Sequence, residues 1–153
     1  MFEIFKSTLN KVKNHEDKIE KDEVKALSSI VSLLVEAASI DGQIGDDEKN
    51  KISSILINQL KLDPIKAKEI LDETISLSSD QIEIWSKTND IRKELDYDER
   101  LNILELMWEI VLVDDVLDVF EAQLMRRVSG LLYISDFDSG NSKKRALLNL
   151  KNN

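Results

Sequence analysis

Acidic side chains recur at one constant spacing in the two halves of this 153-residue chain. The stretch 34–48 aligns without a gap on the stretch 107–121, because each acidic position returns at the same offset (109 − 36 = 73). The repeated pairs are Glu36 with Glu109, Asp41 with Asp114, and Glu48 with Glu121. Carboxylates repeated in this way can cap helices, pair with bases or bind a cation.

Asp41 and Asp114 each follow an apolar helical stretch, at the end where a helix carries its partial negative charge. A carboxylate opposes the helix dipole there by about 0.3–1 kcal/mol, so another interaction is expected to favour it. Three interactions qualify: an Asx-turn with the N–H groups of the turn, an ion pair with a base, or a bound cation. The nearby bases lie on the helix expected after each turn, and they are Lys49, Lys51, Arg126 and Arg127.

The two repeated glutamates after the turns also have a purely structural explanation. Glu48 and Glu121 fall about three residues into a new helix, where acids complement the helix dipole, and Asp118-x-x-Glu121 matches a capping box. Capping alone and metal ligation therefore both stay open for them. Glu36 and Glu109 are weaker ligand candidates, because five residues on a helix rotate a side chain by about 140° from the following aspartate.

Helical elements must position these residues, since long stretches lack a breaker. Pro64 is the single proline, and the only glycines are at 42, 45, 130 and 140. Apolar residues between these points follow the helical period. The first expected helices are 2–13, 24–40 and 46–60, and Asp63-Pro64 opens the next. Another helix is capped by Ser78, Ser79 or Asp80 and carries Ile82, Trp85 and Ile91. The last three are a helix opened by Asp98 and Glu99 that runs through 113, one at 119–133, and a closing helix capped by Ser142.

These elements predict an all-α, single-domain helical bundle of about seven helices, with an internal pseudo-twofold duplication of helix-turn-helix units. Residues 1–23 are expected to form an N-terminal amphipathic helix and a charged lead, and residues 24–150 the helical domain. The spacing of four large side chains is typical of core positions. These side chains are Trp85, Trp108, Met107 and Met125.

Composition excludes several classes of function. Lys plus Arg is 21 and Asp plus Glu is 30, and this net charge of -9 has the wrong sign for a nucleic-acid binder. The absence of cysteine excludes thiolate zinc, iron–sulfur and cysteine catalysis. The sequence shows neither a membrane span nor a signal peptide, so we expect a cytoplasmic protein. We expect no enzyme, because the only histidine, His15, has no paired nucleophile and no phosphate loop is present.

The run AASIDGQIGDDE and the later run LELMWEIVLVDDVLDVFEAQLMRRVSGLLYISDFD resemble the TerB-like family of tellurite-resistance-associated proteins. Members of that family repeat an A-x-x-D-G-x-[IL]-x-x-x-E turn in each half, and the resemblance covers about residues 24–148. It implies a pseudo-symmetric helical bundle with a divalent metal site at the turns. The matching positions here are Asp41, Gly42, Glu48, Asp114 and Glu121. Asp115 stands where the second repeat of the family has glycine. This aspartate either tolerates the positive φ of such a turn or adds a carboxylate to the site.

The expected metal ligands are Asp41, Glu48, Asp114 and Glu121. Carboxylate oxygens favour a hard cation, so calcium, magnesium or manganese is expected, in a turn too short to be an EF-hand. The resemblance implies a non-enzymatic role in a stress- or tellurite-resistance-associated process. The alternative is a protein-interaction scaffold whose acidic turns are structural, hold no metal and present acidic surface to a basic partner. A metal-dependent hydrolase has the least support.

Overall fold

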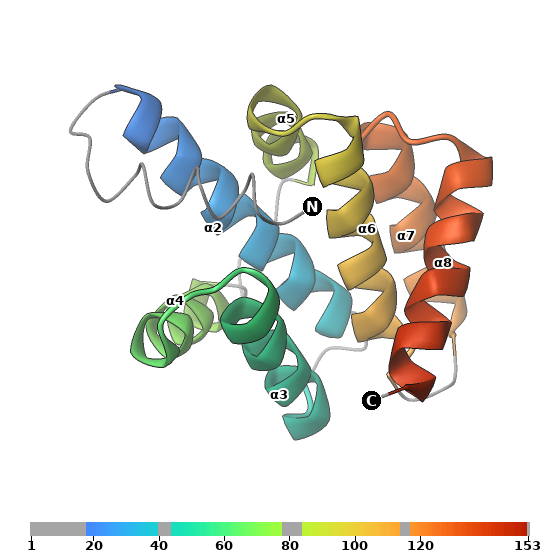
Figure 1. The fold of residues 1–153 in the computed structure, drawn as a ribbon, viewed down its shortest axis with the longest axis horizontal. Helices are drawn as coiled ribbons and strands as arrows, with labels where there is room; N and C mark the ends of the chain where they lie inside the picture. The colour runs from blue at the N-terminus through green and yellow to red at the C-terminus, as the bar shows by residue number, and fades with distance from the viewer. Residues whose placement is uncertain (1–17, 40–43, 78–83, 114–116, 153) are drawn as a thin grey trace.

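The computed structural model describes residues 18–39, 44–77, 84–113 and 117–152, with side chains described from residue 24 onward. These residues form seven α-helices and one π-helical segment, with no strand among them (Figure 1). The elements are α2 (Lys18–Ala38), α3 (Asp46–Ser54), the π-helical η1 (Ile55–Gln59), α4 (Pro64–Leu77), α5 (Ile84–Glu94), α6 (Tyr97–Val111), α7 (Val119–Leu131) and α8 (Asp136–Lys151). The prediction of an all-α bundle is confirmed.

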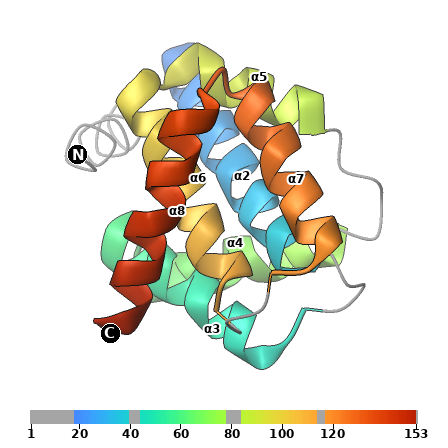
Figure 2. The same ribbon diagram turned by 90° about the vertical axis from the view of Figure 1, so that its right-hand side faces the viewer.

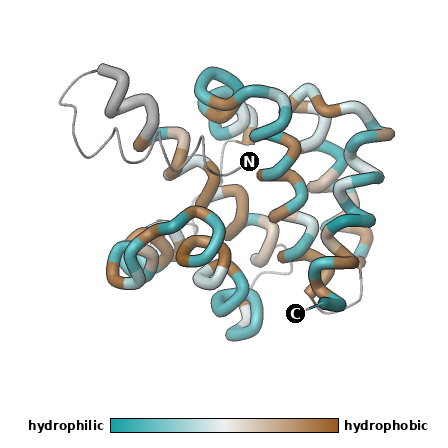
Figure 3. The backbone as a smooth tube through the Cα atoms, viewed as in Figure 1, coloured by the Kyte–Doolittle hydropathy of each residue, from teal (hydrophilic) through white to brown (hydrophobic). Residues whose placement is uncertain are grey.

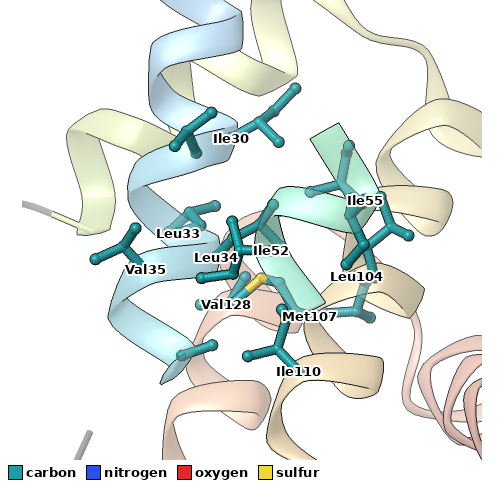
Figure 4. Packing of buried hydrophobic residues seen from close by; sticks show 14 of the residues in the cluster. Ile30, Leu33, Leu34, Val35, Ile52, Ile55, Leu104, Met107, Ile110 and Val128 are labelled. Atoms are coloured by element: carbon teal, nitrogen blue, oxygen red, sulfur yellow. The ribbon is translucent and has the colours of Figure 1, made fainter. Parts of the chain in front are cut away.

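Helices α2 and α6 form the centre of the bundle. Helix α2 packs against α4, α5 and α6, and α6 packs in turn against α7 and α8 (Figures 1 and 2). Hydrophobic stretches lie along α2 and α6, whereas α3 and α8 carry many hydrophilic residues (Figure 3). Fully buried side chains of four elements meet in one core, among them Leu34, Ile52, Met107 and Val128 (Figure 4).

The ends of both central helices lie at the same end of the bundle. In Figure 2 the last residues of α2 and α6 and the first residues of α3 and α7 all lie in the lower part of the view. Helix α2 ends at Ala38 and α6 at Val111, and α3 begins at Asp46 and α7 at Val119. The two ends and the two starts differ by the same offset as the acidic positions (111 − 38 = 73; 119 − 46 = 73). The helix bounds therefore follow the repeat of the sequence, while a twofold axis stays a prediction.

A π-helical segment in the first half lowers the offset by one for the residues that follow it. Lys61 and Tyr133, each just beyond the second helix of its half, have positive φ values of 59° and 58°. Their numbers differ by one less than the offset of the helix starts (133 − 61 = 72), because η1 inserts one extra residue into the first half. The sequence predicts a single helix over 46–60, and no residue within it signals this insertion.

Two predicted helix starts need correction. Helix α2 begins at Lys18, six residues before the predicted start at Val24 (24 − 18 = 6), because the charged lead consists mainly of good helix formers. The closing helix begins at Asp136, since the Ser135 hydroxyl accepts a hydrogen bond from the Asp138 N–H at 3.1 Å. Ser142, the predicted cap, lies buried in the middle of α8. In contrast, the start at Pro64 is confirmed, with the Asp63 carboxylate accepting from the Ile65 N–H at 3.2 Å.

The core prediction is right for three of its four side chains. Trp108, Met107 and Met125 are buried, but the side chain of Trp85 is 61% exposed. The neighbouring Ile84 takes the inward position at the start of α5, so the prediction is wrong for Trp85, although Ile91 on the same predicted face is buried. The predicted helix 2–13, His15 and the predicted cap at 78–80 lie outside the described residues. None of the described helices has the length and apolar character needed to span a membrane.

Candidate functional site

The start of α7 is closed by a capping box. The Asp118 carboxylate accepts a hydrogen bond from the Glu121 N–H at 3.0 Å, and the Glu121 carboxylate accepts one from the Asp118 N–H at 3.2 Å. These bonds satisfy two backbone donors that have no partner inside the helix. The capping box predicted from the sequence is confirmed, so Glu121 has a structural role whether or not it also binds a metal.

The start of α3 uses the same glutamate position without a side-chain cap. Gly45 precedes the helix and offers no side-chain hydrogen bond. The Glu48 carboxylate lies over this glycine, so a Cβ atom at residue 45 would collide with Glu48 Oε2. Glu48 and Glu121 thus occupy equivalent positions in two helix starts, one beside a glycine and the other beside a capping aspartate.

The structure describes only half of the predicted metal ligands. Asp41 and Asp114 lie outside the described residues, as do Gly42 and Asp115. Among the residues that are described, no three His, Cys, Asp or Glu side chains gather in a way that holds a metal ion. The carboxylates of Glu48 and Glu121 suit a hard cation chemically, but they do not make a site by themselves. The four-ligand site stays a prediction.

A buried ion pair joins the two halves at this end of the bundle. Lys51 Nζ on α3 lies 3.1 Å from Glu109 Oε1 on α6, and the two side chains are 16% and 2% exposed. Lys51 is one of the bases that the sequence places near Asp41, and in the structure its partner is Glu109. Removing one member of such a pair leaves an uncompensated charge in a poorly solvated place.

A known protein family matches most of this chain. The family described as Tellurite resistance protein TerB matches residues 26–144, which include both helix starts and the ion pair. The chain belongs to the TerB family. No curated protein and no solved structure matches the chain. The TerB match confirms the resemblance, and the chain therefore belongs to a tellurite-resistance-associated family.

A surface pocket of about 310 Å³ lies between α2, α5 and α7 of this TerB-family chain. Its lining residues are Glu36, Ile84, Phe120, Gln123, Leu124 and Arg127. Glu36 is partly buried, and this burial raises the pKa of its carboxyl group above 4.5. No ion pair within the described parts of the chain involves the side chain of Glu36 or Arg127.

Glu36 and Glu109 are repeated in the sequence, but their surroundings in the structure differ. Glu109 pairs with Lys51, whereas Glu36 faces a pocket that also contains Leu124. Lys51 and Leu124 are themselves related by the offset of the repeat (124 − 51 = 73). This change from a base to an apolar residue at one repeated position is the signal in the sequence that sets the two glutamates apart.

Proposed function

We propose that this TerB-family chain is a non-enzymatic helical module whose two acidic turns bind one divalent cation, in a tellurite-resistance-associated process. One observation supports this most strongly. The helices that lead into and out of both turns meet at the same end of the bundle (Figure 2). Because both turns join helix ends at that end of the bundle, carboxylates from both would be within reach of one ion.

The proposed ligands are Asp41 and Asp114 within the turns, with Glu48 and Glu121 at the helix starts. Carboxylates alone favour calcium, magnesium or manganese over zinc or copper. Glu121 also accepts a capping hydrogen bond from Asp118, so its contact with a cation has to be compatible with that bond. The cation would offset the mutual repulsion of the acidic groups at this end of the molecule.

A non-enzymatic role is supported by the family, which is not a known enzyme family. The sequence adds that no nucleophile is paired with a base and that no glycine-rich phosphate loop is present. Carboxylates at a metal could assist hydrolysis only with an open coordination position, for which the described residues offer no support.

A second candidate is a protein-interaction scaffold in which the acidic turns are structural. The capping box of Asp118 and Glu121 favours it, because the helix start alone accounts for both carboxylates. The net charge of -9 then suits a partner with a basic surface. In this case metal has no effect on the stability of the fold.

Metal titration separates the two candidates. Chelator-treated protein is titrated with calcium, magnesium and manganese by calorimetry, and its melting temperature is measured at low ionic strength. A ligand at 100 times its Kd adds about 2.7 kcal/mol, which should raise the melting temperature by several degrees. Asp41→Asn combined with Asp114→Asn should abolish that rise, and it should raise the metal-free melting temperature because repulsion is relieved.

A matched control removes two carboxylates elsewhere. Glu69→Gln combined with Glu73→Gln changes the net charge equally on the exposed side of α4, and this variant should keep the full response to metal. Wild-type protein whose melting temperature is indifferent to millimolar calcium, magnesium and manganese would contradict metal binding and leave the scaffold as the better account.

A further inference from the structure

Glu36 and Glu109 hold equivalent positions in their helices. Glu36 is the third residue from the end of α2, and Glu109 is the third from the end of α6. The side chain that faces each glutamate comes from the sixth residue of a helix that follows one of the turns. That residue is Lys51 in α3, facing Glu109, and Leu124 in α7, lining the pocket with Glu36. One carboxylate therefore has an ammonium group of the chain itself beside it, and the other has an apolar side chain.

The surroundings of Glu36 are poorly solvated but open to a ligand. Ile84 and Leu124 are 6% and 5% exposed and form apolar walls, while Phe120 is largely exposed at the pocket. Glu36 has no ion-pair partner among the described residues, although burial raises its pKa. A partly buried carboxylate of this kind is stabilised by an opposite charge that enters from solution.

We propose that this pocket binds the primary ammonium group of a small amino compound, held by Glu36 as Lys51 Nζ is held by Glu109. The short apolar part of the ligand packs against Leu124 and Phe120. Arg127 adds a positive charge to the same pocket, and Gln123 adds an amide. These two groups favour a ligand that carries a carboxylate of its own, so an apolar α-amino acid binds more tightly than a simple alkylamine.

The dimensions of the pocket suit this class of ligand. Its volume of about 310 Å³ lies at the lower limit for small-molecule sites in proteins. The apolar walls with a few polar groups are typical of such sites. A single charged contact with a partly solvated carboxylate gives modest affinity, so binding is expected in the millimolar range.

Titrations followed by ¹H–¹⁵N NMR test the proposal on the full-length chain. The probes are butylammonium, norleucine and hexanoate, the last of which has the alkyl chain without the ammonium group. Each is added in the presence of chelator at constant ionic strength. Butylammonium and norleucine should cause saturable shifts in the last turn of α2 and in α7, and hexanoate should cause none. Norleucine should bind more tightly than butylammonium, and equal binding by the two amines would contradict the contact with Arg127.

Variants show whether Glu36 is the binding group. Glu36→Gln should weaken binding of butylammonium at least tenfold, whereas Glu69→Gln, an equal change of charge on α4, should leave it unchanged. Leu124→Lys supplies an internal ammonium group at the position equivalent to Lys51, and it should likewise abolish binding. Both Glu36→Gln and Leu124→Lys are checked for a native-like spectrum before titration.

Three results would overturn the proposal. They are the absence of a saturable shift with both amines at tens of millimolar, equal shifts with hexanoate, and amine binding that survives Glu36→Gln. Since all titrations contain chelator and leave Asp41 and Asp114 unchanged, failure here does not bear on metal binding at the turns. Conversely, a result that contradicts metal binding at the turns does not bear on amine binding at this pocket.

Discussion

Glu109 and Glu36 occupy equivalent positions in the repeat but have different surroundings. Glu109 is almost completely buried and lies 3.1 Å from the ammonium group of Lys51, which closes that side of the bundle. Glu36 is only partly buried and lies in a pocket lined by Leu124, where the other half has the lysine. The Lys51–Glu109 pair links α3 to α6, and the pocket at Glu36 is the place where we propose that a ligand binds.

Breaking the ion pair between Lys51 and Glu109 should have the largest effect on the free energy of unfolding. Lys51→Met leaves the buried carboxyl group of Glu109 without its ion-pair partner, so the free energy of unfolding should fall by about 3–5 kcal/mol. Urea denaturation followed by circular dichroism measures this loss. The denaturant slope should stay unchanged if the variant keeps the native fold.

The double variant Lys51→Met with Glu109→Leu sharpens the interpretation. Replacing both charges by apolar groups removes the unpaired carboxylate, so most of the lost stability should return. If the double variant is as unstable as Lys51→Met alone, the loss comes from packing around Lys51 and not from the charge of Glu109.

Removing the side-chain cap of α7 should have a smaller effect on the free energy of unfolding. Asp118→Ala removes the side-chain cap of α7 and should lower the free energy of unfolding by about 0.5–2 kcal/mol in thermal or urea denaturation. Asp118→Asn is the control, since asparagine caps about as well but carries no charge. Equal losses in both variants would mean that charge at this position, and not the capping hydrogen bond, stabilises the helix.

Glu36 should give the smallest effect, visible in the pH dependence of stability. Burial raises the pKa of Glu36 in the folded chain above 4.5, so the folded state binds more protons than the unfolded state between these two pKa values. The free energy of unfolding of the wild type, relative to Glu36→Gln, should therefore decrease as the pH rises from 4.5 through the folded pKa. Parallel urea denaturation of both proteins at several pH values measures the difference. Curves that run parallel through this range would show that Glu36 has the same pKa in the folded and unfolded states.

Much of the fold was predictable because local signals were strong. Asp63-Pro64 and Asp118-x-x-Glu121 each specify a helix start by their own chemistry, and the structure has both. The starts at Lys18 and Asp136 were missed, since the charged lead has no apolar stripe and the polar segment around Gly140 favours a loop. Gly140 is tolerated inside α8, although glycine is disfavoured there by about 1 kcal/mol relative to alanine.

The site was less predictable than the fold. The repeat identified Glu36 and Glu109, but the pairing of Lys51 with Glu109 depends on how α3 packs beside α6, which the sequence alone does not specify. The same holds for Trp85, whose helix places Ile84 inward instead. Helical period predicts a face to within about one residue, and tertiary packing decides which neighbour is buried.

The pKa of Glu36, measured by ¹³C NMR of its carboxyl group in the wild type and in Leu124→Lys, tests the central claim most directly. The claim is that Glu36 is a partly buried carboxylate that lacks the ammonium group which Glu109 has beside it. It predicts a pKa above 4.5 in the wild type and a clear decrease in Leu124→Lys, because a nearby positive charge favours the ionised form. A wild-type pKa at or below 4.5, or one that Leu124→Lys leaves unchanged, would contradict the account.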